Sequence, residues 1–222
     1  MKDYCDVLRS RTSTDTLDLE VLRFETSEIL EGQLNGRELV ASTSFGNDLA
    51  GTADTDTDAA ATYAGYTTIT DDTGAIQLDV PSEWSQIDGQ PFQAPDGTQF
   101  FDVRAASDLE AFQTSWTTPG VIVTASSQFA RSGNEVTLLD DLKPSLEGQC
   151  TYAGREPYED PAYTGQFDLY TECGGVGAVY VVISVVPPDR SFVIRVQVQA
   201  NSDRDFDVLD RVIDTFVVIG QV

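Results

Sequence analysis

The sequence contains no histidine and little positive charge. Its 222 residues include 13 lysines and arginines against 37 aspartates and glutamates, a formal net charge of −24. Without histidine, neither a Ser-His-Asp nor a Cys-His catalytic arrangement can be built, and most catalytic zinc sites lose a usual ligand. A Ser-Lys nucleophile would have to use Lys2 or Lys143, and neither lies in a recognisable motif. We therefore expect that the chain is not an enzyme and carries no cofactor or metal.

The shortage of positive charge also bears on partners. Nucleic acid backbones and anionic lipid headgroups are bound by clusters of lysine and arginine, which a chain with this acidic surplus does not offer. Acidity of this degree mainly maintains solubility, and either a high-salt habitat or a GC-rich genome would favour it. We expect no nucleic acid partner, and a protein or peptide partner instead.

Long hydrophobic runs are absent as well. The longest, Val176–Pro188, is typical of a strand and falls short of the roughly 18 residues that cross a bilayer. The first residues, Met1–Asp6, lack the apolar core of a signal peptide. No membrane insertion is expected for this chain.

Cysteine is scarce, with three residues at Cys5, Cys150 and Cys173. The last two stand at the outer ends of two strand-like runs, Cys150–Tyr158 and Tyr163–Cys173, joined by a Pro/Asp-rich turn. Opposed ends of a hairpin come close enough for a disulfide, which would stabilise the fold by roughly 3 kcal/mol. The alternative is a pair of buried free thiols. Cys5 is expected to be a buried thiol on a helix.

A structural disulfide implies an oxidising compartment. That expectation conflicts with the missing signal peptide if Met1 is the native start, and a larger parent protein would resolve the conflict. We therefore expect an extracytoplasmic location as part of a larger protein, or a cytoplasmic one if Met1 is the true start.

Composition and periodicity divide the chain into three parts. Residues 1–45 combine the end of a helix (3–10) with two strands, Leu17–Phe24 and Glu28–Leu34, of which the first alternates apolar and acidic residues. Residues 46–62 are small, polar and without periodicity, as in a flexible acidic linker. The remainder forms the main domain, residues 63–222.

The main domain reads as an antiparallel sheet with packed helices, an α+β fold. Helices are expected at Asp108–Trp116, capped by Ser107, at Val136–Leu142, and after the cap Ser202. In the run Phe192–Val198 the even positions are apolar, so Arg195, Gln197 and Gln199 are expected to face outward. Further strands are expected at Tyr66–Thr70, Ala75–Val80, Phe100–Ala105, Gly120–Ala125, Cys150–Tyr158, Tyr163–Cys173 and Val179–Val186.

Few motifs suggest chemistry. The run Asp54–Asp58 resembles the start of a calcium loop, but Ala59 replaces its glycine and Gly65 its bidentate glutamate. Glu156, Glu159 and Asp160 lie on one loop, although glycosidase chemistry needs two carboxylates opposed across a cleft.

The segment 155–163 is the most distinctive candidate for an exposed loop. Arg155, Tyr158 and Tyr163 are of the types that dominate binding hot spots, so they form a possible interaction loop. The alternative is a hairpin tip with ordinary turn chemistry.

Three segments near the start, Asp3–Ser10, Thr16–Arg23 and Glu28–Leu34, resemble the end of a PDZ domain as found in HtrA-like secreted serine proteases. The order of elements is helix, strand ending in Val-x-Arg, and last strand. The carboxylate-binding loop, the peptide-pairing strand and the protease motifs are absent, so the resemblance supplies no site residue.

The larger region resembles a PsbP-like domain. The resemblance lies in Asp72–Trp84, a hairpin ending in Pro-x-x-Trp, and in the closing helix that runs into Asp214–Val217. It implies a protein-binding module without catalysis. We therefore predict a non-catalytic accessory or interaction module of an extracytoplasmic HtrA-like serine protease. The alternatives are a free-standing PsbP-like ligand- or protein-binding protein and a carboxylate-based hydrolase.

Overall fold

The computed structural model describes residues 17–23, 28–34, 40–43 and 62–222. The chain divides into two compact units, Met1–Ser44 and Phe45–Val222. The helix expected over 3–10, Cys5, the calcium-like run and all of the linker except Thr62 lie outside the described residues.

The first unit contains a three-stranded antiparallel sheet. Its strands β1 (Leu17–Arg23), β2 (Glu28–Leu34) and β3 (Val40–Thr43) follow one another in chain order across the sheet. The first two strands were expected from the sequence, and β3 was not. Three strands of this kind do not distinguish a PDZ remnant from other small sheets.

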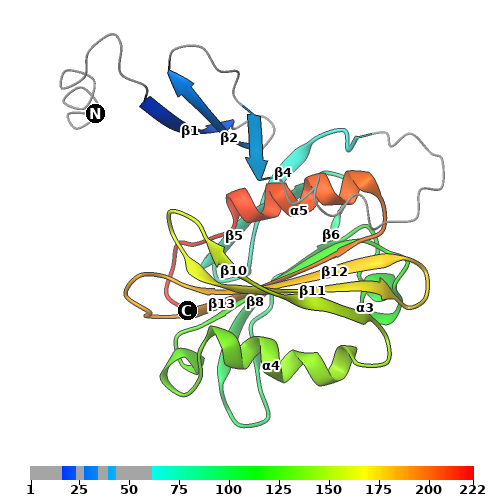
Figure 1. The fold of residues 1–222 in the computed structure, drawn as a ribbon. Helices are drawn as coiled ribbons and strands as arrows, with labels where there is room; N and C mark the ends of the chain where they lie inside the picture. Colours follow the sequence, from blue (N-terminus) through cyan, green and yellow to red (C-terminus); the bar gives the residue numbers. More distant parts are fainter. Residues whose placement is uncertain (1–16, 24–27, 35–39, 44–61) are drawn as a thin grey trace. The chain divides into compact units, whose positions relative to one another are not determined.

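The second unit is built on an eight-stranded sheet, in which every pairing is antiparallel (Figure 1). The strands lie in the order β10-β11-β12-β13-β9-β8-β6, and β7 also pairs with β8. In chain order they are β6 (Gln86–Asp88), β7 (Phe92–Gln93), β8 (Gln99–Ala106), β9 (Gly120–Ser126), β10 (Thr151–Glu159), β11 (Thr164–Cys173), β12 (Ala178–Val186) and β13 (Val193–Ala200).

A smaller sheet has the order β14-β5-β4. It joins β4 (Tyr66–Thr70), β5 (Ile76–Pro81) and β14 (Val217–Val218). The strands and helices together confirm the predicted α+β class. No helix in the described part of the chain is long and apolar enough to cross a membrane.

Two helices cover opposite faces of the large sheet (Figure 1). Helix α5 (Asp203–Thr215) begins after Ser202, as expected, and packs Phe206, Leu209 and Val212 into the main core. Helix α4 (Glu135–Leu146) crosses the other face above β11, β12 and β13. The short helix α3 (Leu109–Thr114) follows β8.

The register of the strands gives the two faces of the sheet different characters. Toward α5 the side chains are almost all aliphatic, for example Val103, Val123 and Ile183 in the main core. Toward α4, adjacent rows across the sheet are polar; we call this surface the polar face. One row runs Asp102–Thr124–Arg195–Ser184, and the next runs Arg104–Ile122–Gln197–Val182–Asp168.

The polar face corrects the expectation that Arg195, Gln197 and Gln199 point to solvent. The alternation is right, but Gln197 and Gln199 are only 4% and 2% exposed. Helix α4 and the segment after α3 cover them, which the pattern of a single strand does not predict.

Two helix boundaries also differ from expectation. The N-cap of α3 is Asp108 and not Ser107, because the Asp108 carboxylate accepts from the Ala111 N–H at 3.0 Å. Helix α4 does not end before Pro144 but continues to Leu146. A proline in the last turn removes only one intrahelical hydrogen bond, so the helix can pass through it.

Candidate functional site

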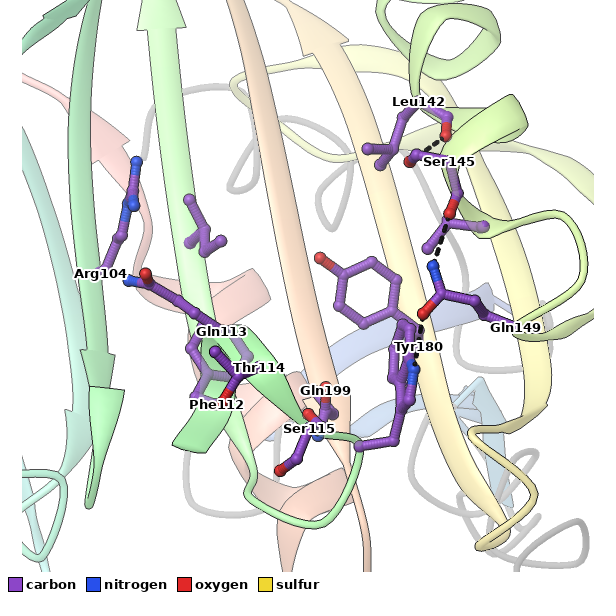
Figure 2. Close-up of a pocket in the computed structure, with 13 residues that line it drawn as sticks. Arg104, Phe112, Gln113, Thr114, Ser115, Leu142, Ser145, Gln149, Tyr180 and Gln199 are labelled. Atoms are coloured by element: carbon purple, nitrogen blue, oxygen red, sulfur yellow. Dashed lines mark hydrogen bonds between the residues drawn. The ribbon is translucent and has the colours of Figure 1, made fainter. Parts of the chain in front are cut away.

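A pocket of about 340 Å³ opens between α3 and α4 over the polar face (Figure 2). We call it the α3–α4 pocket. In the close-up, Arg104 and Gln113 lie on one side of Tyr180, and Ser145 and Gln149 lie on the other. Its size is at the lower end of the range typical of small-ligand sites.

The α4 wall is ordered by hydrogen bonds along the helix end (Figure 2). The Ser145 hydroxyl donates to the Leu142 carbonyl at 2.6 Å, and the Gln149 amide donates to the Ser145 carbonyl at 2.8 Å. The Gln149 side-chain oxygen then accepts from the Trp116 indole N–H at 3.2 Å. One glutamine thus connects the α4 wall to the segment after α3.

A disulfide anchors the same region. Cys150 and Cys173 are joined, as expected from the sequence, and link the start of β10 to the end of β11. Beside them the Gly174 N–H donates to the Gln149 carbonyl at 2.8 Å. Gly174 has φ +65°, and an added Cβ would lie 2.5 Å from Trp116. Only glycine therefore lets Trp116 pack against this turn.

The glycine run that contains Gly174 is a turn between β11 and β12. Gly174, Gly175 and Gly177 all have positive φ. The run precedes a strand rather than a helix, so it offers no cradle for a phosphate group.

The floor of the pocket comes from the polar face. The Tyr180 ring packs edge-on against Trp116, with 5.5 Å between ring centroids. Its hydroxyl donates to Gln197 Oε1 at 3.0 Å, and burial raises the pKa of Tyr180 to about 12. The Gln199 amide donates to the Thr118 carbonyl at 2.8 Å. Tyr180 is thus a neutral hydrogen-bonding group at physiological pH.

The inner end of the pocket carries the charged groups. Arg104 Nε lies 2.5 Å from Asp102 Oδ2, and the Thr124 hydroxyl donates to Asp102 Oδ1 at 2.7 Å. Burial raises the pKa of Asp102 despite these partners. Arg195 stands in the same row as Asp102, and its Nε is buried without a hydrogen-bond partner among the described residues.

The lining has a consistent chemical character. Of its 13 residues, Phe112, Trp116 and Tyr180 are aromatic and Arg104 is the one with a charge. The rest are three glutamines, serines, a threonine and aliphatic residues, with no carboxylate, thiol or amine among them. The lining can therefore pack a ring, donate and accept hydrogen bonds, and neutralise a negative charge.

The expected interaction loop is placed differently. Tyr158 and Tyr163 are each 5% exposed and belong to the main core, so the prediction that they form an exposed binding surface is wrong. They lie at the joined ends of β10 and β11. There Tyr163 stacks on Phe216 and its hydroxyl accepts from the Val218 N–H at 3.2 Å.

Arg155, the third member of that loop, has an internal role. Its Nε and Nη2 donate to the two oxygens of Asp168 at 2.6 and 2.8 Å, and Nη1 donates to Asp140 at 2.9 Å. The Asp168 side chain is 1% exposed. A guanidinium engaged in this way holds β10, β11 and α4 together and is not available to a partner.

The carboxylates that the sequence brings together do not form a paired site. Asp160 accepts hydrogen bonds from the Tyr158 hydroxyl and from the backbone N–H groups of Ala162 and Tyr163, so it closes the hairpin turn. Glu156 and Glu159 are exposed on β10. Among the described residues, no group of histidine, cysteine or acidic side chains is placed to hold a metal ion.

Sequence reasoning missed the pocket. Trp84 lies in the core at 1% exposure, whereas Trp116 is half-buried in the pocket wall. Two features of the sequence could have indicated the pocket: the polar positions in the run Phe192–Val198, and a second tryptophan, Trp116. The elements that close the pocket are far apart in sequence, from Arg104 to Gln199.

Comparisons with known proteins place the fold only loosely. No protein-family model matches the chain, and no curated protein matches it. Among solved structures it is similar to the Ran-binding protein Mog1p of Saccharomyces cerevisiae, at 10% identity and TM-score 0.38, covering 70% of this chain and 96% of that one. It is also similar to cyanobacterial PsbP (CyanoP) from Synechocystis sp. PCC 6803, at 13% identity and TM-score 0.38, covering 74% and 98%.

The second of these structures carries the PsbP name that the sequence resemblance suggested. Neither likeness is strong enough to transfer a function. Neither of these two structures is a PDZ domain or an HtrA-like protease.

Proposed function

We propose that this chain is a non-catalytic binding module that receives an aromatic or amide-bearing group of its partner in the α3–α4 pocket. The observation that carries the proposal is the lining: aromatic walls, convergent amide and hydroxyl groups, and no carboxylate in a chain of net charge −24. Apolar walls with a few placed polar groups are the usual composition of ligand sites.

The absence of catalysis is supported by the state of the polar groups. A nucleophile needs an adjacent base, and the Ser145 hydroxyl donates to a backbone carbonyl instead. Tyr180 holds its proton, and Asp102 is engaged by Arg104 and Thr124. The pocket thus offers recognition without a group poised for proton transfer.

Location and parent protein are part of the proposal. The Cys150–Cys173 disulfide supports an oxidising, extracytoplasmic compartment. Attachment to an HtrA-like protease rests on residues 1–45. Sequencing the DNA upstream of Met1 tests it. An open frame encoding a His, Asp and Ser protease domain is the expected result, and a stop codon before Met1 would favour the free-standing alternative.

The two tryptophans provide a direct binding assay. Their indole N–H groups have different surroundings: Trp84 donates to Tyr63 in the core, and Trp116 donates to Gln149 in the pocket wall. In a ¹⁵N-labelled sample, phenylacetamide and N-acetylphenylalanine amide should shift the Trp116 indole resonance in a saturable way. The Trp84 resonance should stay in place and serves as the internal control.

A pair of serine variants tests where binding occurs. Ser145→Phe places a ring in the pocket from an exposed position and should abolish the shift. Ser132→Phe is the matched control, because Ser132 is also exposed and also donates to a carbonyl three residues earlier, outside the pocket. Saturable shifts that survive in Ser145→Phe, or no shift with any aromatic probe, would refute the proposed function.

A further inference from the structure

The polar face contains a guanidinium that its buried carboxylates leave without a hydrogen bond at Nε. Asp102 lies two residues from Arg104 on β8 and in the same row as Arg195, with Thr124 of β9 between them. One of its carboxylate oxygens accepts from Arg104 and the other from Thr124, and neither oxygen accepts from the Arg195 Nε–H. Arg195 retains a buried Nε without a hydrogen-bond partner among the described residues.

Such an arrangement is unfavourable by itself. Buried polar groups are nearly always hydrogen-bonded. Burial without a hydrogen-bond partner costs the most free energy when the group is ionised. Burial accordingly lowers the pKa of Arg195, and it outweighs the favourable effects of Tyr180, Asp102 and the exposed Asp141 of α4. Arg104 lowers the pKa further, as a nearby like charge does.

The unsatisfied charge lies next to the pocket. Arg104 lines the α3–α4 pocket, and so does the Tyr180 ring. The Tyr180 hydroxyl points to Gln197, two residues from Arg195 on the same face of β13. Arg195 does not itself line the pocket, but its cross-strand partner Thr124 is two residues from the lining residue Ile122 on β9.

We propose that the inner end of the α3–α4 pocket is a carboxylate subsite formed by Arg104 and Arg195. A single ligand carboxylate would supply the acceptor that Arg195 Nε lacks among the described residues. Guanidinium groups bind carboxylates in a planar, charge-assisted geometry. This inference rests on the proposed binding function and specifies its ligand: an aromatic or amide-bearing group that carries one carboxylate.

The test compares acids with their amides on the intact chain, using the Trp116 indole and the Arg195 Nε–H resonance. The pairs are phenylacetate with phenylacetamide and N-acetylphenylalanine with its amide. The acids should bind at least about tenfold more tightly, as expected for hydrogen bonds to a charged group. The Arg195 Nε–H should shift with the acids only.

The source of the carboxylate is resolved by a second comparison. If a free organic acid is the ligand, phenylacetate should bind as tightly as an N-acetylated tripeptide ending in phenylalanine. If the ligand is the C-terminus of a protein, the tripeptide acid should bind more tightly, and its C-terminal amide should lose that advantage. Both results support the subsite and differ only in where the carboxylate comes from.

Variants separate recognition from folding. Arg195→Met removes an uncompensated charge, so it should fold with undiminished stability, yet it should bring the acid down to the affinity of its amide. Arg131→Met replaces an exposed arginine outside the pocket and should keep the acid preference. The wild-type comparison of acid and amide stands even if Arg195→Met folds poorly.

The outcomes distinguish the two proposals. Equal affinity for acid and amide, or an Arg195 Nε–H that does not respond to the acid, overturns the carboxylate subsite and leaves the binding function intact. An acid preference that persists in Arg195→Met also overturns it. If neither member of either pair moves the Trp116 indole, the subsite and the proposed function fail together.

Discussion

Removing the Cys150–Cys173 disulfide should destabilise the second unit by a predictable amount. The two cysteines are separated by 23 positions, and closing a loop of that length in the unfolded chain corresponds to about 3 kcal/mol. Cys173 is fully buried, so Cys150→Ala/Cys173→Ala also leaves a small cavity, worth up to about 1 kcal/mol. For a chain of this size the melting temperature should fall by roughly 6 to 12 °C.

The measurement is urea unfolding at pH 7 of the oxidised wild type, the wild type reduced with a phosphine, and the double variant. The reduced wild type should lose about 3 kcal/mol and the variant slightly more, while the reductant should leave the variant unchanged. Loss of the crosslink should also alter Trp116 fluorescence, because the Gly174–Gln149 contact that supports its hydrogen bond lies beside the disulfide. Equal stability of all three samples would refute the role given to this bond.

Two further experiments test the polar face. Asp168→Asn should cost about 3 to 5 kcal/mol in urea unfolding, because it leaves the Arg155 guanidinium without its buried partner. Asp140→Asn, at 60% side-chain exposure, should cost under about 1 kcal/mol. Similar losses of stability in the two variants would contradict this ranking. Tyr180 has its pKa raised from 10.0 to about 12, so the stability that it contributes is complete below pH 10 and is lost as pH rises toward 12. Between pH 8 and pH 11, Tyr180→Phe should therefore lose about 1 kcal/mol less stability than the wild type, and an unchanged difference between the two would argue against the shift.

The secondary structure was largely predictable because it depends on local patterns. The alternation in Leu17–Phe24 and the continuous apolar run Val179–Val186 each correspond to a strand, and the latter is buried along its whole length. The hairpin between Cys150 and Cys173 also follows from two β-rich runs around a Pro/Asp turn. These features need no knowledge of what packs above the sheet.

The site was not predictable in the same way. The alternation of residues along a strand shows which positions share a face, but it does not show which other elements pack on that face. The pattern around Arg195 separates polar from apolar positions correctly, but α4 and the segment after α3 bury the polar side. The same limit explains the loop: Tyr158 and Tyr163 look like binding residues by type, and only the approach of Phe216 and Val218 from the far end of the chain makes them core.

The edges of the large sheet bear on where a partner can bind. Strand addition needs a regular edge with free backbone groups. The edge strand β10 contains Pro157, which has no N–H, and a register shift between Tyr152 and Gly154. At the other end, β6 and β7 span three and two residues. Proline, bulges and short strands are the devices that prevent edge pairing. A partner that binds this unit therefore finds little support at either edge, and the α3–α4 pocket offers the stronger contacts through its aromatic walls and the Arg104 guanidinium.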